Sequence, residues 1–249
     1  MPVVNVGDTT LYYEDAGDAA RPAILALAPG GLDSQARFWG VRADGQPRNF
    51  PDPRPFLARH FRLITLDQRN AGNSHGPYAR PLTWDDYAAD QLGLLDRLGI
   101  ERFHILGACI GGPFGFKLIE RAGDRVASFV VQATSGLDDH NRAHFEQSFR
   151  DWSAGFRARW PDADPDVLAR QYQLLFGGDF IFSVDRDFVA SVTTPLLVLR
   201  GHDTPHPGAI SDEIHALARD SRIEDAWEGE ENRARYPGLL LDFFHAHST

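Results

Sequence analysis

The sequence contains a single cysteine, Cys109. One cysteine can form neither an internal disulfide bond nor a cysteine-rich zinc site. We therefore expect a reducing, cytoplasmic location. The chain also lacks any apolar run near the roughly 20 residues that a membrane-spanning helix needs. Residues 1–5 carry no basic segment followed by an apolar one. We therefore expect neither a signal peptide nor an association with membranes.

Basic residues are fewer than acidic ones. The chain has 25 Lys and Arg residues against 35 Asp and Glu, a formal net charge of -10. Binding to nucleic acid needs a basic patch, so we expect no nucleic-acid partner; the acidic excess is typical of solubility. The length of 249 residues, 43% of them hydrophobic, suffices for one α/β domain with an insertion or for two small domains. The oligomeric state stays open, a homodimer included.

Short continuous apolar runs recur along the chain, and such runs are typical of strands buried on both faces of a parallel sheet. They lie at residues 23–28, 62–67, 103–107, 125–133 and 195–200, with a weaker one at 223–227. Residues 3–16 read as a hairpin with a turn at Gly7 and Asp8. Helical patterns lie at 83–98, 211–219 and 239–247. Strands alternating with helices predict an α/β fold with a mostly parallel sheet flanked by helices.

Two stretches interrupt this alternation. Residues 39–55 are rich in Gly, Pro, Asn and charge, and we expect a long loop there. Residues 137–189 contain no buried-strand run but many aromatic side chains. We interpret them as a small helical cap, or lid, inserted into a core made of residues 1–136 and 190–249.

The most informative stretch surrounds Cys109. The apolar run 103–107 leads into Gly107-Ala108-Cys109-Ile110-Gly111, and a helix-forming segment follows. Glycines suit a sharp reversal from strand to helix, which would expose Cys109 at a helix start where the dipole favours a thiolate. This pattern predicts a nucleophile elbow with Cys109 as the nucleophile. The alternative is a buried, unreactive cysteine at a tight turn.

Four motifs, taken in their order, resemble those of the α/β-hydrolase superfamily over nearly the whole chain. They are Ala-Pro-Gly-Gly at 28–31, Asp-Gln-Arg-Asn-Ala-Gly-Asn-Ser at 67–74, Gly-Ala-Cys-Ile-Gly at 107–111 and Thr-Pro-Leu-Leu-Val-Leu-Arg-Gly-His-Asp at 194–203. The resemblance is closest to the peptidase and esterase branches, although a cysteine nucleophile is found in dienelactone hydrolases. It implies the α/β-hydrolase fold.

The resemblance also implies roles for several residues. An oxyanion hole would be formed by the backbone N–H groups of Gly31 and Ile110. Asp203, directly after a predicted strand, would be the acid that orients a catalytic imidazole. An aspartate at such a turn can instead simply bond the turn backbone.

The catalytic base is the departure from the family pattern. In the family the histidine follows the last strand, whereas this chain has no histidine between His215 and His245. We expect Asn232 in the place of the imidazole, within reach of Cys109 and Asp203, as a degenerate constellation. Histidines elsewhere are alternatives. His206 is the best of these because its loop meets the same sheet edge as Cys109; the others are His140, His144, His245 and His247.

These residues predict a cofactor-free hydrolase or acyltransferase with a small-molecule substrate. A Cys109 thiolate would attack the activated carbonyl of an ester, thioester or lactone that is mainly apolar. We expect no metal, since His202, Asp203 and His206 have no further ligand in local spacing. The alternative function is a non-hydrolytic or inactive homologue that binds or reshapes a small ligand without an acyl-enzyme.

Overall fold

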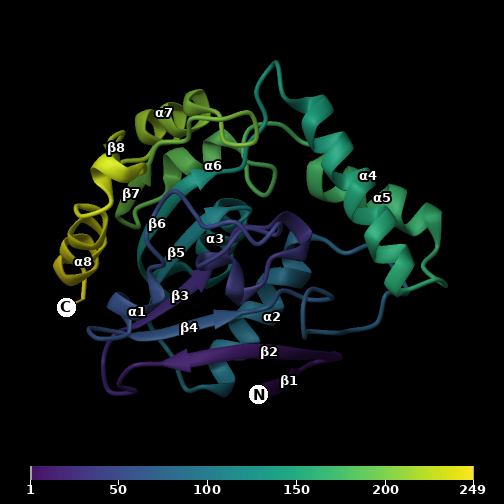
Figure 1. The fold of residues 1–249 in the computed structure, drawn as a ribbon, viewed down its shortest axis with the longest axis horizontal. Helices are drawn as coiled ribbons and strands as arrows, with labels where there is room; N and C mark the ends of the chain where they lie inside the picture. The colour runs from purple at the N-terminus through teal and green to yellow at the C-terminus, as the bar shows by residue number, and fades with distance from the viewer. Residues whose placement is uncertain (1, 249) are drawn as a thin grey trace.

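An eight-stranded sheet forms the centre of the computed structural model, which describes residues 2–248 (Figure 1). The strand order is β1-β2-β4-β3-β5-β6-β7-β8; β2 runs antiparallel to its neighbours β1 and β4, and the other neighbouring strands pair in parallel. This confirms the predicted hairpin and the predicted, mostly parallel sheet. The strands are β1 (Val3–Val6), β2 (Thr9–Ala16), β3 (Ala23–Leu27), β4 (Arg62–Leu66), β5 (Phe103–Cys109), β6 (Val126–Thr134), β7 (Leu196–Leu199) and β8 (Ser221–Glu224).

Helices cover both faces of the sheet. They are α1 (Arg54–Leu57), α2 (Trp84–Arg97), α3 (Gly111–Ala122), α4 (Arg142–Arg159), α5 (Pro165–Phe176), α6 (Arg186–Ser191), α7 (Gly208–Leu217) and α8 (Tyr236–Ala246). The predicted start of α2 is confirmed: Thr83 and Asp86 form a capping box, which satisfies N–H groups that a helix start leaves unpaired. The three helices expected between strands are present, with shifted ends for α7 and α8.

Alternation along the buried strands divides the core into two layers. In β3, Leu25 and Leu27 pack with α2 and α3, whereas Ile24 and Ala26 pack with α1 and α8 on the opposite face. Because successive strand side chains point to opposite faces, a strand covered by helices on both sides is apolar at most positions. This is the reason for the continuous apolar runs in the sequence.

Asp67, directly after β4, fastens the loop that follows β3. Its Oδ1 accepts a hydrogen bond from the N–H of Ala36 at 2.9 Å, and its Oδ2 accepts one from the N–H of Asn73 at 2.8 Å. Gly72 has φ +52°, and a Cβ there would lie 2.2 Å from Asp67 Oδ2. The turn therefore requires glycine, and the Asp67 motif holds the loop that begins at Pro29 against the sheet.

Arg69, in the same motif, forms a buried ion pair with Asp90 of α2. The Arg69 Nε and Nη2 atoms lie 2.7 and 2.8 Å from the two carboxylate oxygens. The two side chains are 8% and 3% exposed. Such a bidentate pair orients both groups and is screened little by solvent.

Asp90→Ala should lower the free energy of unfolding by about 3–5 kcal/mol, because it leaves a buried guanidinium without its main partner. The measurement is urea unfolding. Asp96→Ala is the matched control: Asp96 also lies on α2 and contacts Arg125 at 2.7 Å, but it is exposed. An exposed pair contributes about 0–1 kcal/mol. Equal losses in the two variants would contradict the assignment.

The segment 137–189 contributes no strand to the sheet. Figure 1 shows its helices α4 and α5 side by side, away from the sheet at one edge of the molecule. The N–H of Leu137 donates to the carbonyl of Phe180 at 2.6 Å, so two distant parts of the segment are joined. Among the helices of residues 2–248, none has the length and apolar character to cross a membrane.

Candidate active site

Cys109 ends β5, and α3 begins two residues later at Gly111. Its φ is +57°, a left-handed conformation that non-glycine residues rarely adopt. The flanking glycines are sterically required: a Cβ on Gly107 would lie 2.3 Å from the Gly111 carbonyl oxygen, and one on Gly111 would lie 2.5 Å from that of Leu27. The predicted sharp turn between strand and helix is therefore present.

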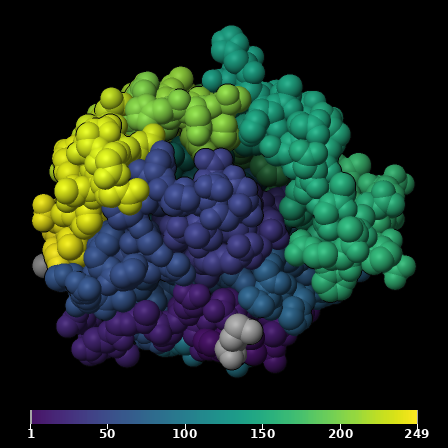
Figure 2. All heavy atoms as spheres, in the orientation of Figure 1, coloured from purple at the N-terminus to yellow at the C-terminus, as the bar shows by residue number. Residues whose placement is uncertain are grey.

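Two cavities meet at Cys109. The first, here called the apolar chamber, has a volume of about 450 Å³, and its wall includes Phe149 and Trp152 of α4 and Phe176 of α5. The second, here called the polar chamber, has a volume of about 430 Å³ and includes Asn49 and Glu228. In Figure 2 the blue segment that contains the predicted loop 39–55 covers the middle of the visible face, between yellow α8 and green α4 and α5.

His206 lies beside Cys109 in the walls of both chambers. Its loop joins β7 to α7, where a Cβ on Gly201 would lie 2.2 Å from the His206 carbonyl oxygen. The imidazole Nδ1 lies 2.6 Å from Asp203 Oδ1, and the backbone N–H of His206 donates to the same oxygen at 3.1 Å. Asp203 thus holds the ring and the loop together.

The second ring nitrogen of His206, Nε2, is buried and has no aligned hydrogen-bond partner among residues 2–248. The sulfur of Cys109 lies 3.2 Å from the Ser135 hydroxyl. Imidazole and sulfur therefore interact mainly through charge across the shared cavity. A loose arrangement of this kind is common in enzymes without bound substrate, where catalytic hydrogen bonds tighten only on binding.

The charges of Cys109 and His206 shift each other's pKa. Burial alone would raise the pKa of the Cys109 thiol, but the charge on His206 and hydrogen bonds with Ser135 and the Gly30 N–H lower it to about 6. Burial alone would lower the pKa of His206, but Cys109 and Asp203 raise it to about 10. Near neutral pH the pair is a thiolate and an imidazolium.

The two expected oxyanion-hole residues, Gly31 and Ile110, both line the apolar chamber next to Cys109. Gly31 has φ +61° and opens a short 3-10 turn, Gly31–Asp33. Within residues 2–248 the backbone N–H groups of Gly31 and Ile110 donate to no acceptor. Two unpaired N–H groups beside Cys109 are donors of the kind that an oxyanion hole needs.

The expectation for Asn232 is wrong. Asn232 ends the 3-10 turn Glu230–Asn232, its Nδ2 donates to the Glu228 carbonyl at 2.9 Å, and it lines neither chamber. The reason is the path of the chain after β8. Trp227 anchors the loop by donating to the Arg200 carbonyl at 2.8 Å, so Glu228 reaches the polar chamber and Asn232 does not.

Of the other histidines considered as alternative bases, one lines a chamber at Cys109 and the others do not. His144 lines the apolar chamber, whereas His140 lines neither chamber. His245 packs against His60 and Phe61, and His247 contacts the Phe243 carbonyl on α8. His202, at 3.7 Å from Asp225, forms no metal-binding cluster with its neighbours in the described part of the chain.

The sequence analysis did not predict two contributors to the site, Ser135 and Arg48. Ser135 follows β6, whose carboxyl end meets the same sheet edge as Cys109, so its position offered a signal. Arg48 lies in a loop without regular pattern, and no sequence feature predicts that it lines both chambers.

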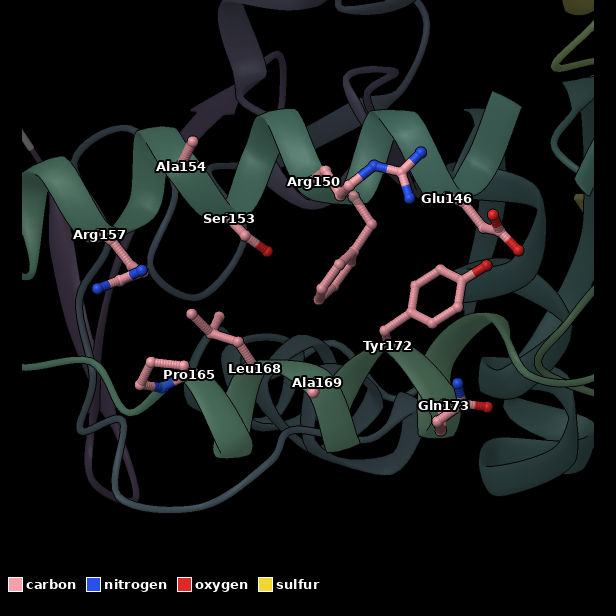
Figure 3. Close-up of a pocket in the computed structure, with 11 residues that line it drawn as sticks. Glu146, Arg150, Ser153, Ala154, Arg157, Pro165, Leu168, Ala169, Tyr172 and Gln173 are labelled. Atoms are coloured by element: carbon pink, nitrogen blue, oxygen red, sulfur yellow. The ribbon is translucent and has the colours of Figure 1, made fainter. Parts of the chain in front are cut away.

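A further cavity of about 490 Å³ lies between α4 and α5 (Figure 3). Figure 3 shows Ser153 and Tyr172 facing it, with Arg150 and Arg157 on α4. The wall includes no cysteine or histidine, and Cys109 lies outside it. The candidate nucleophile and base therefore line the chambers at Cys109 and not this further cavity.

Residues 43–184 match the family model described as "alpha/beta hydrolase fold". The chain belongs to this family, as its motifs predicted, and it has the family's sheet flanked by helices. Solved structures agree. Over 99% of this chain and 98% of the other, a meta-cleavage product hydrolase from Pseudomonas fluorescens superimposes with a TM-score of 0.73 at 18% identity. An enol-lactonase from Burkholderia xenovorans gives a TM-score of 0.71 at 22% identity, covering 98% of this chain and 100% of the other.

Among curated proteins, a putative carbamate hydrolase from Azorhizobium caulinodans is 33% identical over 147 residues, which cover 59% of this chain and 49% of that protein. Rhodomycin D methylesterase from a Streptomyces species is 29% identical over 150 residues, or 59% of this chain and 47% of that protein. The chain spans about half the length of these relatives.

Proposed function

We propose that this protein is a cofactor-free hydrolase that cleaves the activated carbonyl of a small, mainly apolar ester, thioester or lactone through a cysteine nucleophile. One observation carries the proposal: Cys109 and the Asp203-bound His206 meet at a shared cavity. The related carbamate hydrolase and methylesterase sequences support carbonyl hydrolysis. In this proposal His206, and not Asn232, is the general acid and base.

In the first half of the reaction, the Cys109 thiolate attacks the carbonyl carbon and forms a carbon–sulfur bond. The N–H groups of Gly31 and Ile110 donate hydrogen bonds to the oxyanion. The bond between carbon and the leaving oxygen then breaks, and the His206 imidazolium gives its Nε2 proton to that oxygen. The products of this half are a thioester on Cys109, a free alcohol and a neutral imidazole.

In the second half, the neutral His206 takes a proton from water as the water oxygen attacks the thioester. The carbon–sulfur bond breaks, the carboxylic acid leaves, and the thiolate–imidazolium pair is restored. Asp203 keeps Nδ1 protonated and so directs Nε2 to the reacting atoms. Each cycle consumes one water and returns the site to its starting charge.

The apolar chamber fits the apolar part of such a substrate. Aromatic side chains from α4 and α5, Phe149 and Phe176 among them, line it opposite the loop of Gly30 and Gly31. Its volume of about 450 Å³ is in the range of pockets for small ligands.

The direct test is to trap the thioester. Rapid mixing with para-nitrophenyl butyrate should release a burst of para-nitrophenol, followed by slower turnover. Mass spectrometry of the quenched protein should find a butyryl group on the peptide that contains Cys109. Urea-unfolded protein is the control for nonspecific acylation. If the folded protein shows neither burst, turnover nor adduct, the proposal fails and the non-hydrolytic alternative is favoured.

A further inference from the structure

The polar chamber adjoins the apolar chamber at Cys109, and the two share Pro29, Arg42, Arg48, Pro205 and His206 in their walls. A carbonyl held at the sulfur has one substituent on each side. With one substituent in the apolar chamber, the other extends into the polar chamber. The side chains of the polar chamber therefore select a specific part of the substrate.

Arg48 lines the polar chamber and, among residues 2–248, forms no ion pair. It is half-buried, and its Nε donates to the Phe38 carbonyl at 2.9 Å, which fixes the guanidinium in place. No carboxylate within residues 2–248 forms an ion pair with Arg48. Burial lowers the pKa of Arg48, an effect that the negative charge on Cys109 partly offsets. A partly desolvated cation is stabilised by an anion, and a guanidinium binds a carboxylate through two parallel hydrogen bonds.

The acidic groups of the chamber are occupied by partners other than Arg48. Arg42 lies in the same walls and contacts Asp44 only at 3.8 Å, at the exposed rim. Of the two acidic groups, Asp203 is bound to His206, and Glu228 accepts a hydrogen bond from Asn49 at 2.6 Å. Burial raises the pKa of Glu228, and its hydrogen bond with Asn49 partly offsets that rise. His202, which also lines the polar chamber, lies 3.7 Å from Asp225.

We infer that the substrate carries a carboxylate, which Arg48 binds in the polar chamber with Arg42 beside it, while the apolar part of the substrate occupies the apolar chamber. This inference rests on the proposed hydrolysis at Cys109 and adds the substrate class to it. The protein would then be selective for monoesters or monothioesters of acidic molecules over their neutral analogues.

The test compares two pairs of esters that differ by one charge. The first pair is para-nitrophenyl hydrogen glutarate and its methyl ester, with the carboxylate on the acyl side. The second pair is para-carboxyphenyl hexanoate and its methyl ester, with the carboxylate on the leaving group. In the wild type, kcat/KM should favour the anionic member of at least one pair by tenfold or more, after correction for the uncatalysed rates.

Arg48→Gln should reduce that preference about 10–100-fold, the usual range for a charge-assisted hydrogen bond. Arg97→Gln removes the same charge from an exposed position on α2, remote from both chambers, and should keep the preference. Arg48→Glu should reverse it toward an ester that carries a trimethylammonium group.

The failures of the two proposals are distinguishable. If no ester of either pair acylates Cys109, the hydrolase proposal fails, and the inferred substrate class, which depends on it, fails as well. If the esters are hydrolysed but neither pair shows a preference in the wild type, the carboxylate subsite is refuted while the hydrolase proposal stands. The wild-type comparison holds even if a variant of Arg48 does not fold.

Discussion

Cys109→Ala should lower kcat/KM for ester hydrolysis by about 10⁴–10⁶-fold, the range seen when a nucleophile is removed from a catalytic triad. The surroundings of the Cys109 sulfur lower its pKa to about 6, which favours the anionic nucleophile near neutral pH. Ser135 is close, at 3.2 Å from the sulfur, but a hydroxyl is a weak nucleophile without its own base. The measurement is steady-state turnover together with the acyl-adduct assay.

Asn232→Ala is the matched control for this loss, since Asn232 lines neither chamber. Its turnover should stay within about twofold of the wild type, as is usual for a substitution outside a site. The variant Cys109→Ala should have no adduct and an unchanged unfolding transition. Full turnover in Cys109→Ala would refute covalent catalysis and favour a reaction driven by the shape and polarity of the pocket.

His206→Gln should have the second largest effect, a loss of about 10²–10⁴-fold in kcat/KM, the usual contribution of a positioned general acid or base. It should also change the pH dependence of the thiol. An imidazolium stabilises the thiolate, so its removal must raise the pKa of Cys109 from about 6 toward the free value of about 8.5. Alkylation by iodoacetamide should therefore slow at pH values between these two limits and stay unchanged above them.

The rate of alkylation against pH reads this shift directly and does not depend on any substrate. Asp203→Asn should shift the same curve in the same direction, because Asp203 raises the pKa of His206. Asn232→Ala should leave the curve in place. The opposite result, a shift in Asn232→Ala and none in His206→Gln, would restore the asparagine as the partner of Cys109.

A histidine on the acid loop has a consequence for the mechanism. Asp203 and His206 are three residues apart, and they close their own hydrogen-bonded turn through Nδ1 and through the backbone N–H. In the proposed mechanism the acid and the base therefore move as one unit relative to Cys109. The proposed base does not come from the loop after β8, whose Glu228 lines the polar chamber.

The central sheet could be predicted from local sequence. A strand covered on both faces is apolar at most positions, so the apolar runs predict β3, β4, β5, β6 and β7 without a structure. The turn at Cys109 was readable for a similar reason: Gly107 and Gly111 face neighbouring backbone at distances that exclude a Cβ. These requirements act on individual positions, and the sequence must meet them locally.

Which side chains surround the Cys109 sulfur could not be predicted from local sequence and follows from the tertiary structure. The distance between His206 and Cys109 depends on how the loop after β7 folds onto Asp203, and the place of Asn232 depends on the anchor at Trp227. Arg48 reaches both chambers because Phe38 holds its guanidinium. Such loops have no periodic pattern, and their paths are set by contacts between residues far apart in the chain, which no short stretch of sequence records.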